Sequence, residues 1–248
     1  MSKGLALAHA DTRIMDINDI RRACEFCSLR ELCWPMAMAP SELERLQSMV
    51  RRSHTLPVGH HLYRVGDQFT AIYAVRTGCI KSYRLDAGGH ERVLGFHVRG
   101  ELLGFDAVHP DHHRCNALVL EPGSVCVIPY QDIVRLSLEF HSLQTQVMRL
   151  MSREFSKQLM FAEGSVALQR IAVFLMDMQT RLHQPGAAQD EFKLPMSRED
   201  ISNYLGITAE TLSRLIVKLQ KKGLIYANRR YIRLLDRVGL DQISQGIN

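Results

Sequence analysis

The chain has 248 residues, of which 46% are apolar, and a formal net charge of +5. This length and apolar fraction allow one large or two modest domains, each with its own core. No stretch reaches the ~18 consecutive apolar residues that cross a bilayer. The first residues also lack the apolar core and cleavage site of a secretion signal. We therefore expect a cytoplasmic protein with no membrane partner.

A flexible N-terminus is predicted over residues 1–22, and a cysteine segment with the spacing Cys-x2-Cys-x5-Cys follows at Cys24, Cys27 and Cys33. In a reducing cytosol, clustered cysteines indicate metal or redox chemistry more than disulfides. Four thiolates bind either zinc or an iron–sulfur cluster. The spacing alone chooses neither the metal nor the fourth ligand. Three further cysteines could supply that ligand: Cys79, Cys115 and Cys126.

Short apolar runs alternate with glycine-bearing turns between residues 55 and 129. Strand-length units with no long helix between them predict a small antiparallel barrel or jelly roll. Together with the cysteine segment, it forms a predicted sensory domain over residues 23–129. The predicted strands include Ala71–Val75, Ile80–Leu85, Arg92–Val98, Ala117–Leu120 and Val125–Ile128, and the predicted turns include Gly78 and Gly123.

A long helix is predicted next, because residues 130–161 contain no glycine or proline. About 30 residues would span roughly 45 Å, and the apolar residues form a wide stripe along one side. A partner helix in a coiled-coil-like homodimer would bury this stripe; the alternative is packing onto the chain's own barrel. We predict a dimerisation helix over residues 130–163. Its predicted contact residues are Leu143, Val147, Met148, Leu150, Met151, Phe155 and Leu159.

Residues 164–248 are predicted to form a winged helix-turn-helix domain that binds double-stranded DNA. Ser197 can cap the first helix, and Gly206 can end it in a tight turn. Thr208 can cap a second helix that runs to about Lys222. The wing strands are predicted over Leu224–Tyr226 and Tyr231–Leu234.

The second helix of this motif carries the predicted DNA contacts. Arg214 can donate two hydrogen bonds to guanine, and Glu210 can accept one from cytosine. Ala209 and Ser213 lie on the same N-terminal part of the helix, which meets base edges. Other basic residues suit phosphates, which position the protein without specifying sequence. The predicted phosphate contacts are Lys218, Lys221 and Arg229.

Positive charge is concentrated around this motif. Between Ala209 and Arg237 there are eight Lys or Arg residues and only two acids, Glu210 and Asp236, so the rest of the chain is close to neutral. Such a patch is typical of proteins that bind a phosphate backbone.

Several motifs together resemble the cyclic-AMP receptor/FNR superfamily of bacterial regulators, and in particular its FNR branch. The resemblance covers about residues 20–240. The motifs are the Cys-x2-Cys-x5-Cys array and the segments Gly78–Tyr83, Gly104–Ala107, Ser124–Pro129, Met148–Ser152 and Glu210–Arg214.

This resemblance implies an α+β fold with a cyclic-nucleotide-binding-like antiparallel β jelly-roll barrel, a long dimerisation helix and a winged helix-turn-helix. In the FNR branch the fourth ligand lies just before an apolar-Pro step in the last barrel strand. Cys79 and Cys115 are then not ligands. The implied ligands of a [4Fe–4S] cluster are Cys24, Cys27, Cys33 and Cys126.

Two features of the barrel loops bear on other ligands. A cyclic-nucleotide sensor would need a Glu for the ribose, but Gly104 and Phe105 stand there, although Arg114 lies near the phosphate position. His109, His112 and His113 beside Cys115 could form a zinc site, but we favour a polar loop.

The resulting hypothesis is an oxygen-responsive transcription regulator that binds TTGAT…ATCAA-type palindromes as a homodimer. The cluster would hold residues 20–35 against the barrel and the long helix, and its loss in oxygen would weaken the dimer and DNA binding. Activation would need a contact with RNA polymerase, for which the exposed turn Asp86–Gly89 is a candidate.

Two alternatives remain open. A regulator of the same architecture could hold zinc or a smaller cluster on its cysteines, or sense redox state by thiol chemistry. An enzyme is disfavoured, because neither a dinucleotide-binding Gly-x-Gly-x-x-Gly nor a plausible nucleophile–base pair is evident.

Overall fold

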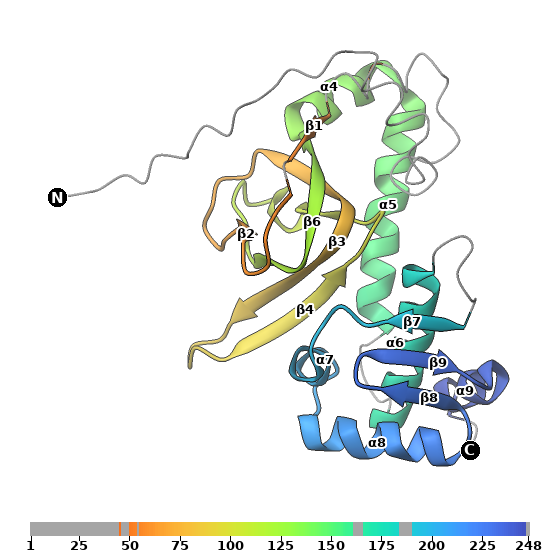
Figure 1. The fold of residues 1–248 in the computed structure, drawn as a ribbon. Helices are drawn as coiled ribbons and strands as arrows, with labels where there is room; N and C mark the ends of the chain where they lie inside the picture. The colour runs from red at the N-terminus through yellow and green to blue at the C-terminus, as the bar shows by residue number, and fades with distance from the viewer. Residues whose placement is uncertain (1–44, 46–49, 54, 161–165, 184–189, 247–248) are drawn as a thin grey trace.

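The computed structural model describes residues 45, 50–53, 55–160, 166–183 and 190–246 (Figure 1). The cysteine segment, with Cys24, Cys27 and Cys33, lies outside the described residues, and so does the N-terminus over residues 1–22. Among the described residues, no helix is both long and apolar enough to cross a membrane.

The N-terminal half is a barrel-like antiparallel sheet. The strand order is β1-β6-β3-β4, with β2 also paired to β6 and β5 to β3. A short 3₁₀ turn, η1 (Phe105–Ala107), follows β5. The strands are β1 (Arg51–Arg52), β2 (His61–Tyr63), β3 (Ala71–Leu85), β4 (Glu91–His97), β5 (Leu102–Leu103) and β6 (Asn116–Pro129).

The predicted turns at Gly78 and Gly123 were wrong, because both glycines lie inside long strands. β3 joins two of the predicted strands, and β6 joins two others. The register between β3 and β6 shifts around Gly78, which has a φ of +82°. A Cβ on Gly123 would clash with the backbone oxygen of Thr77. Gly78 therefore allows a bulge, and Gly123 allows a close approach of two backbones. In the sequence alone, a glycine in either place looks like a turn glycine.

The predicted single helix after the barrel is two helices, α4 (Tyr130–Glu139) and α5 (His141–Met160). Phe140 between them has extended backbone angles, φ −122° and ψ 103°. Its side chain packs against an apolar cluster that the barrel shares with α4 and α5, here called the barrel–helix cluster, and Arg45 lies over its ring. The cluster includes Ile72, Ile128, Leu136 and Leu143. No glycine or proline marks this break between the two helices. It occurs where the side chain of Phe140 packs against the rest of the chain.

The C-terminal part is a helix-turn-helix followed by a hairpin (Figure 1). A three-stranded sheet has the order β7-β9-β8, and its first strand was not predicted. The elements are α6 (Ala167–Leu182), β7 (Glu191–Lys193), α7 (Arg198–Tyr204), α8 (Ala209–Lys221), β8 (Ile225–Asn228), β9 (Tyr231–Leu234) and α9 (Arg237–Ser244).

One apolar core extends across the predicted boundary between the sensory and DNA-binding parts. Val93, Phe96 and Val98 from the barrel share a buried cluster with Phe174 of α6 and Ile201 of α7. Each large apolar side chain buried there contributes about 1.5–3 kcal/mol. The two parts are therefore packed directly against each other.

Candidate nucleic-acid interface and cysteine site

The first helix of the motif, α7, begins at a capping box. The backbone N of Asp200 donates to Ser197 Oγ at 3.0 Å, and the backbone N of Ser197 donates to Asp200 Oδ2 at 3.1 Å. This reciprocal pair satisfies two amide groups that the helix itself leaves without acceptors. The predicted cap at Ser197 is thus present.

A tight turn joins α7 to α8 at Gly206. Its φ of +63° lies in the left-handed region that glycine adopts readily. Thr208 then caps α8, accepting a hydrogen bond from the backbone N of Thr211 at 3.1 Å. The sequence signals at this turn and this cap correspond to the observed geometry.

The two sides of α8 differ sharply in exposure. Leu212, Ile216 and Leu219 are buried in the core that α8 shares with α6 and α7. The predicted base-contact residues share the opposite, exposed side near the helix N-terminus: Ala209, Glu210, Ser213 and Arg214.

Within this exposed side, the side chains already contact one another. Arg214 Nη2 donates to Glu210 Oε1 at 2.5 Å, and both side chains are more than 70% exposed. Ser213 Oγ donates to the backbone oxygen of Ala209 at 2.9 Å. The predicted phosphate-contact residues are also exposed: Lys218 and Lys221 on α8, and Arg229 in the hairpin turn.

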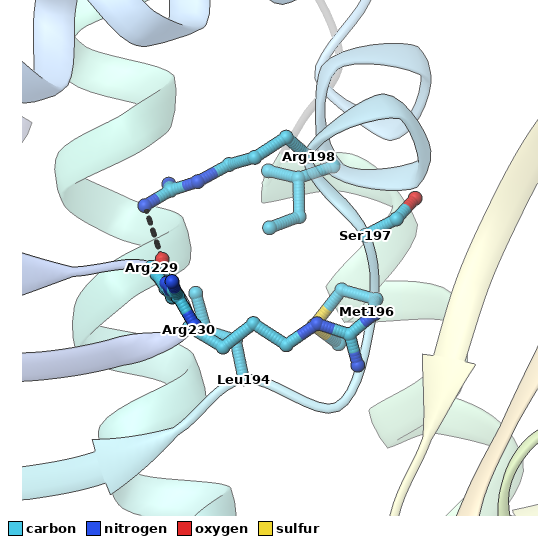
Figure 2. A pocket seen from close by; sticks show the side chains of 7 residues that line it. Leu194, Met196, Ser197, Arg198, Arg229 and Arg230 are labelled. Atoms are coloured by element: carbon cyan, nitrogen blue, oxygen red, sulfur yellow. Dashed lines mark hydrogen bonds between the residues drawn. The ribbon is translucent and has the colours of Figure 1, made fainter.

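A cavity of about 240 Å³ lies between the hairpin turn and the start of α7 (Figure 2). Arg198 Nη2 donates to the backbone oxygen of Arg229 at 2.8 Å, and Arg230 Nη1 donates to that of Pro195 at 3.1 Å. Burial lowers the pKa of Arg198 from its ordinary value. Sequence analysis did not single out Arg198, because only the folded hairpin brings it beside Arg229.

The predicted dimerisation residues divide between two sides of α5. Leu143 and Leu150 are buried in the barrel–helix cluster, and Val147 packs against it. Three others face outward: Met148 is 65% exposed, Met151 40% and Phe155 66%. Leu159 lies in α5, but its side chain is outside the described part.

Cys126 is half-buried on β6, in register with Ala74 of β3 and Arg52 of β1. It packs against the same cluster that contains Leu143 and Leu150 of α5. The other two described cysteines are more deeply buried than Cys126.

Cys79 is 1% exposed and Cys115 is 5% exposed. Burial raises the pKa of both thiols, to about 12 for Cys115. These thiols are therefore protonated and poorly reactive at neutral pH.

The histidine-rich loop is only partly the polar loop that was predicted. His113 is 1% exposed and stacks on Tyr63, with ring centroids 3.6 Å apart. Asp106 lies beside it and accepts a hydrogen bond from the backbone N of Arg114 at 2.8 Å. Burial alone would raise the pKa of Asp106, but hydrogen bonds from His113 and this backbone N lower it. Within the described ranges, no three His, Cys, Asp or Glu side chains are grouped to hold a metal ion.

Comparison with known proteins matches both halves of the chain. Residues 53–139 match the cyclic nucleotide-binding domain, and residues 169–243 match the Crp-like helix-turn-helix domain. The chain is 38% identical over 224 residues to the fumarate and nitrate reduction regulatory protein of Vibrio cholerae, covering 89% of this chain and 90% of that protein. The chain belongs to the Crp/FNR family.

A second relative and a solved structure are also similar to this chain. The Escherichia coli fumarate and nitrate reduction regulatory protein is 37% identical over 224 residues, 89% of this chain and 90% of that protein. FixK2 from Bradyrhizobium japonicum has a similar structure, with a TM-score of 0.70 and 25% identity, over 78% of this chain and 96% of that one. The predicted α+β fold and the family are confirmed, and the chain is a DNA-binding transcription regulator rather than an enzyme.

Proposed function

We propose that this Crp/FNR protein is an oxygen-responsive regulator, active at low oxygen as a homodimer with one [4Fe–4S] cluster per chain. The observation that carries the proposal is the position of Cys126. It pairs with Arg52 of β1, and it packs against the apolar cluster that contains Leu143 and Leu150 of α5. The names of the relatives, which refer to fumarate and nitrate reduction, agree with a role in growth without oxygen. As a DNA-binding regulator it would work in the cytoplasm.

The described chain passes directly beside Cys126 on its way from the cysteine segment. β1 pairs with β6 at Cys126 itself, through Arg52. Val50 packs against the same apolar cluster as Cys126, and Arg45 Nη1 bonds to Glu139 Oε2 of α4 at 2.5 Å. Eleven residues lie between Cys33 and Arg45, and this stretch could span up to roughly 40 Å if extended. The cysteine segment can therefore reach β6.

The chemistry of this donor set fits an iron–sulfur cluster. Cys24, Cys27 and Cys33 with Cys126 would supply four thiolates, the usual ligands of such a cluster. Cys126 is only half-buried, unlike Cys79 and Cys115, which are buried. When bound, the cluster would supply an oxygen-labile, redox-active centre.

The barrel–helix cluster connects Cys126 to the proposed dimer interface. Leu143 and Leu150 anchor one side of α5 in that cluster. Met148, Met151 and Phe155 on the other side would meet the partner helix. When the four cysteines are held together, residues 20–35 would cover this region and favour the pairing of α5; when they are released, the dimer would weaken.

The two α8 helices of the dimer, one from each chain, would then read a two-fold site of the TTGAT…ATCAA type, with half-sites about one helical turn apart. The turn Asp86–Gly89 at the tip of the β3–β4 hairpin is exposed and is a candidate for a contact with RNA polymerase. Asp86 Oδ1 accepts hydrogen bonds from the backbone N of Gly88 and of His90 at 2.8 and 2.9 Å, which holds the turn in one shape.

Purification without oxygen tests the proposal. We expect brown protein with four iron and four sulfide ions per chain, which binds the palindrome and loses both colour and affinity in air. Cys126→Ala should abolish the cluster and lower affinity for the palindrome toward that of non-specific binding, which is roughly 10³-fold or more weaker.

The matched control is Cys115→Ala, which removes a thiol of the same barrel that is not a proposed ligand. It should retain iron and DNA binding. Zinc in place of iron, or a cluster with two irons, would favour the alternative regulator of the same architecture. Unchanged iron content in Cys126→Ala would contradict the assignment of the fourth ligand.

A further inference from the structure

The helix α7 lies against the outer edge of the barrel sheet (Figure 1). β4 ends the strand order β1-β6-β3-β4, so one of its edges faces away from β3. Asn203 of α7 bonds to that edge: its Nδ2 donates to the backbone oxygen of Glu91 at 2.6 Å, and its Oδ1 accepts from the backbone N of Val93 at 2.7 Å. One amide side chain thus makes the bonds that a neighbouring strand would make.

A buried lysine joins the same three elements. Lys81 on β3 donates from Nζ to Glu91 Oε1 of β4 at 2.5 Å and to Asp200 Oδ1 of α7 at 2.7 Å. Its side chain is only 8% exposed, and that of Asp200 only 13%. Removing Lys81 would leave the buried carboxylate of Asp200 without its cation, so this bridge favours one position of α7.

A second ion pair joins the barrel to α6. Arg181 donates from Nε and Nη2 to the two carboxylate oxygens of Glu101 at 2.8 and 2.7 Å, and it also bonds to the backbone oxygen of Phe96. This bidentate pair is nearly buried, with side-chain exposures of 14% and 11%. The DNA-reading part is therefore held through α6 as well as through α7.

The packing beneath these polar contacts is aromatic. Phe96 of β4 lies 5.3 Å from Tyr204 of α7 and 6.3 Å from Phe174 of α6, between ring centroids. The contact as a whole leaves the DNA-reading side of α8 uncovered, because Glu210 and Arg214 remain exposed. This arrangement presents the recognition helix to DNA and does not hide it.

We propose that Lys81 and Asn203 are positioning residues for DNA binding, which touch no DNA but hold the helix-turn-helix at a set orientation on the barrel edge. The proposal rests on the proposed reading of a two-fold site by a homodimer. Because α5 would pair the two chains, α7 and α8 must keep a set position relative to the barrel for both recognition helices to meet half-sites about one turn apart. A loosened α7 would weaken the second contact by lowering its effective concentration.

Two variants and a matched control test this role. Lys81→Met keeps the aliphatic stem but removes the ammonium, and Asn203→Leu removes both bonds to β4 at similar volume. The control is Lys193→Met, which removes another ion pair between the two parts: Lys193 on β7 lies 3.9 Å from Glu121 on β6, but its side chain is 53% exposed. An exposed pair at this distance contributes little.

Hydrogen exchange of the full-length protein without DNA is the first measurement. In Lys81→Met we expect the backbone amides of α7 to exchange about threefold faster or more, although the substitution lies on β3, because local opening becomes easier. Lys193→Met should match the wild type. Unchanged exchange in α7 for both Lys81→Met and Asn203→Leu would overturn the proposal, whatever the state of the cysteines.

DNA binding is the second measurement, on three duplexes: the full palindrome, a single half-site, and a palindrome with two extra base pairs in the spacer. Both variants should bind the full palindrome about tenfold more weakly, bind the half-site within twofold of the wild type, and discriminate less against the longer spacer. An equal loss on all three duplexes would mean damage to the reading surface and would also overturn the proposal.

Iron content and wild-type binding in the same preparations separate this proposal from the proposed function. Wild type without iron, or without preference for the palindrome, would refute the proposed function, while the exchange of α7 would still decide the positioning role. Wild type with both properties, together with variants that match it, would refute the positioning role alone. If Lys81→Met does not fold, Asn203→Leu decides, because it leaves the buried Lys81–Asp200 ion pair in place.

Discussion

At the scale of single residues, the exposed side of α8 already contains a charged pair that would compete with the proposed DNA contact. Arg214 and Glu210 bond at 2.5 Å, but both are largely exposed. An exposed pair of this spacing contributes about 0.3–0.5 kcal/mol, whereas a bidentate contact of Arg to guanine contributes about 1–3 kcal/mol of discrimination. The guanidinium can therefore leave Glu210 for a base at small cost.

Arg214→Ala should weaken binding to the specific site by about 1–3 kcal/mol and relax the preference for guanine at one position of each half-site. Titration of the variant against the palindrome and against duplexes changed at that position measures both effects. Lys221→Ala is the comparison: it should weaken binding about equally on all sequences and reduce the salt dependence. An Arg214→Ala protein with unchanged base preference would contradict the assignment.

At the scale of elements, α5 has two apolar sides that differ in exposure. Leu143 and Leu150 are buried within the chain's own apolar cluster, whereas Met148 and Phe155 are exposed. The predicted alternative of packing onto the chain's own barrel therefore applies to one side of α5, and a partner helix stays a prediction for the other side. An exposed row of large apolar residues on one helix suits a second copy of the same helix.

Phe155→Asp should shift the cluster-bearing protein from dimer to monomer at micromolar concentration, because it places a charge in the proposed helix–helix contact. Analytical ultracentrifugation without oxygen measures this shift. Leu138→Asp is the matched control, since Leu138 on α4 is 86% exposed and is not a proposed contact. A Phe155→Asp protein that remains dimeric would locate the interface elsewhere.

The breaks between elements were the least predictable part of the fold. Phe140 interrupts the helical region without glycine or proline, while β3 and β6 continue through Gly78 and Gly123. A helix ends at Phe140 where its ring enters the apolar cluster, and a strand continues through Gly78 because β6 lies close beside it. The local sequence does not show what packs against Phe140 or which strand lies beside Gly78. Neither outcome could therefore be predicted from it.

At the scale of the whole molecule, buried charges between the barrel and α7 make their contact sensitive to acid. Burial alone would raise the pKa of Asp200, but hydrogen bonds from Lys81 and Ser197 lower it below its ordinary value. Burial alone would likewise lower the pKa of Lys81, but hydrogen bonds to Asp200 and Glu91 raise it. The bridge is therefore ionised throughout the neutral range.

A carboxyl group whose pKa is lower in the folded state stabilises the fold above its unfolded pKa, about 3.9 for Asp, and this stabilisation is lost as the pH falls through the folded value. The difference in free energy of unfolding between wild type and Asp200→Asn should be constant above about pH 5 and shrink below about pH 4. Urea unfolding at a series of pH values measures it. A difference that does not depend on pH would contradict the bridge.

The sequence by itself determined the family, the capped helix-turn-helix with its exposed Glu210 and Arg214, and the barrel-then-helix order. These features depend on local periodicity, caps and motifs, which neighbouring residues specify together. Only the tertiary structure decided that one side of α5 is buried and the other exposed, that Arg198 meets Arg229, and that Lys81 joins three elements. Such contacts form between residues distant in the chain, and each depends on the position of a partner that no local pattern records.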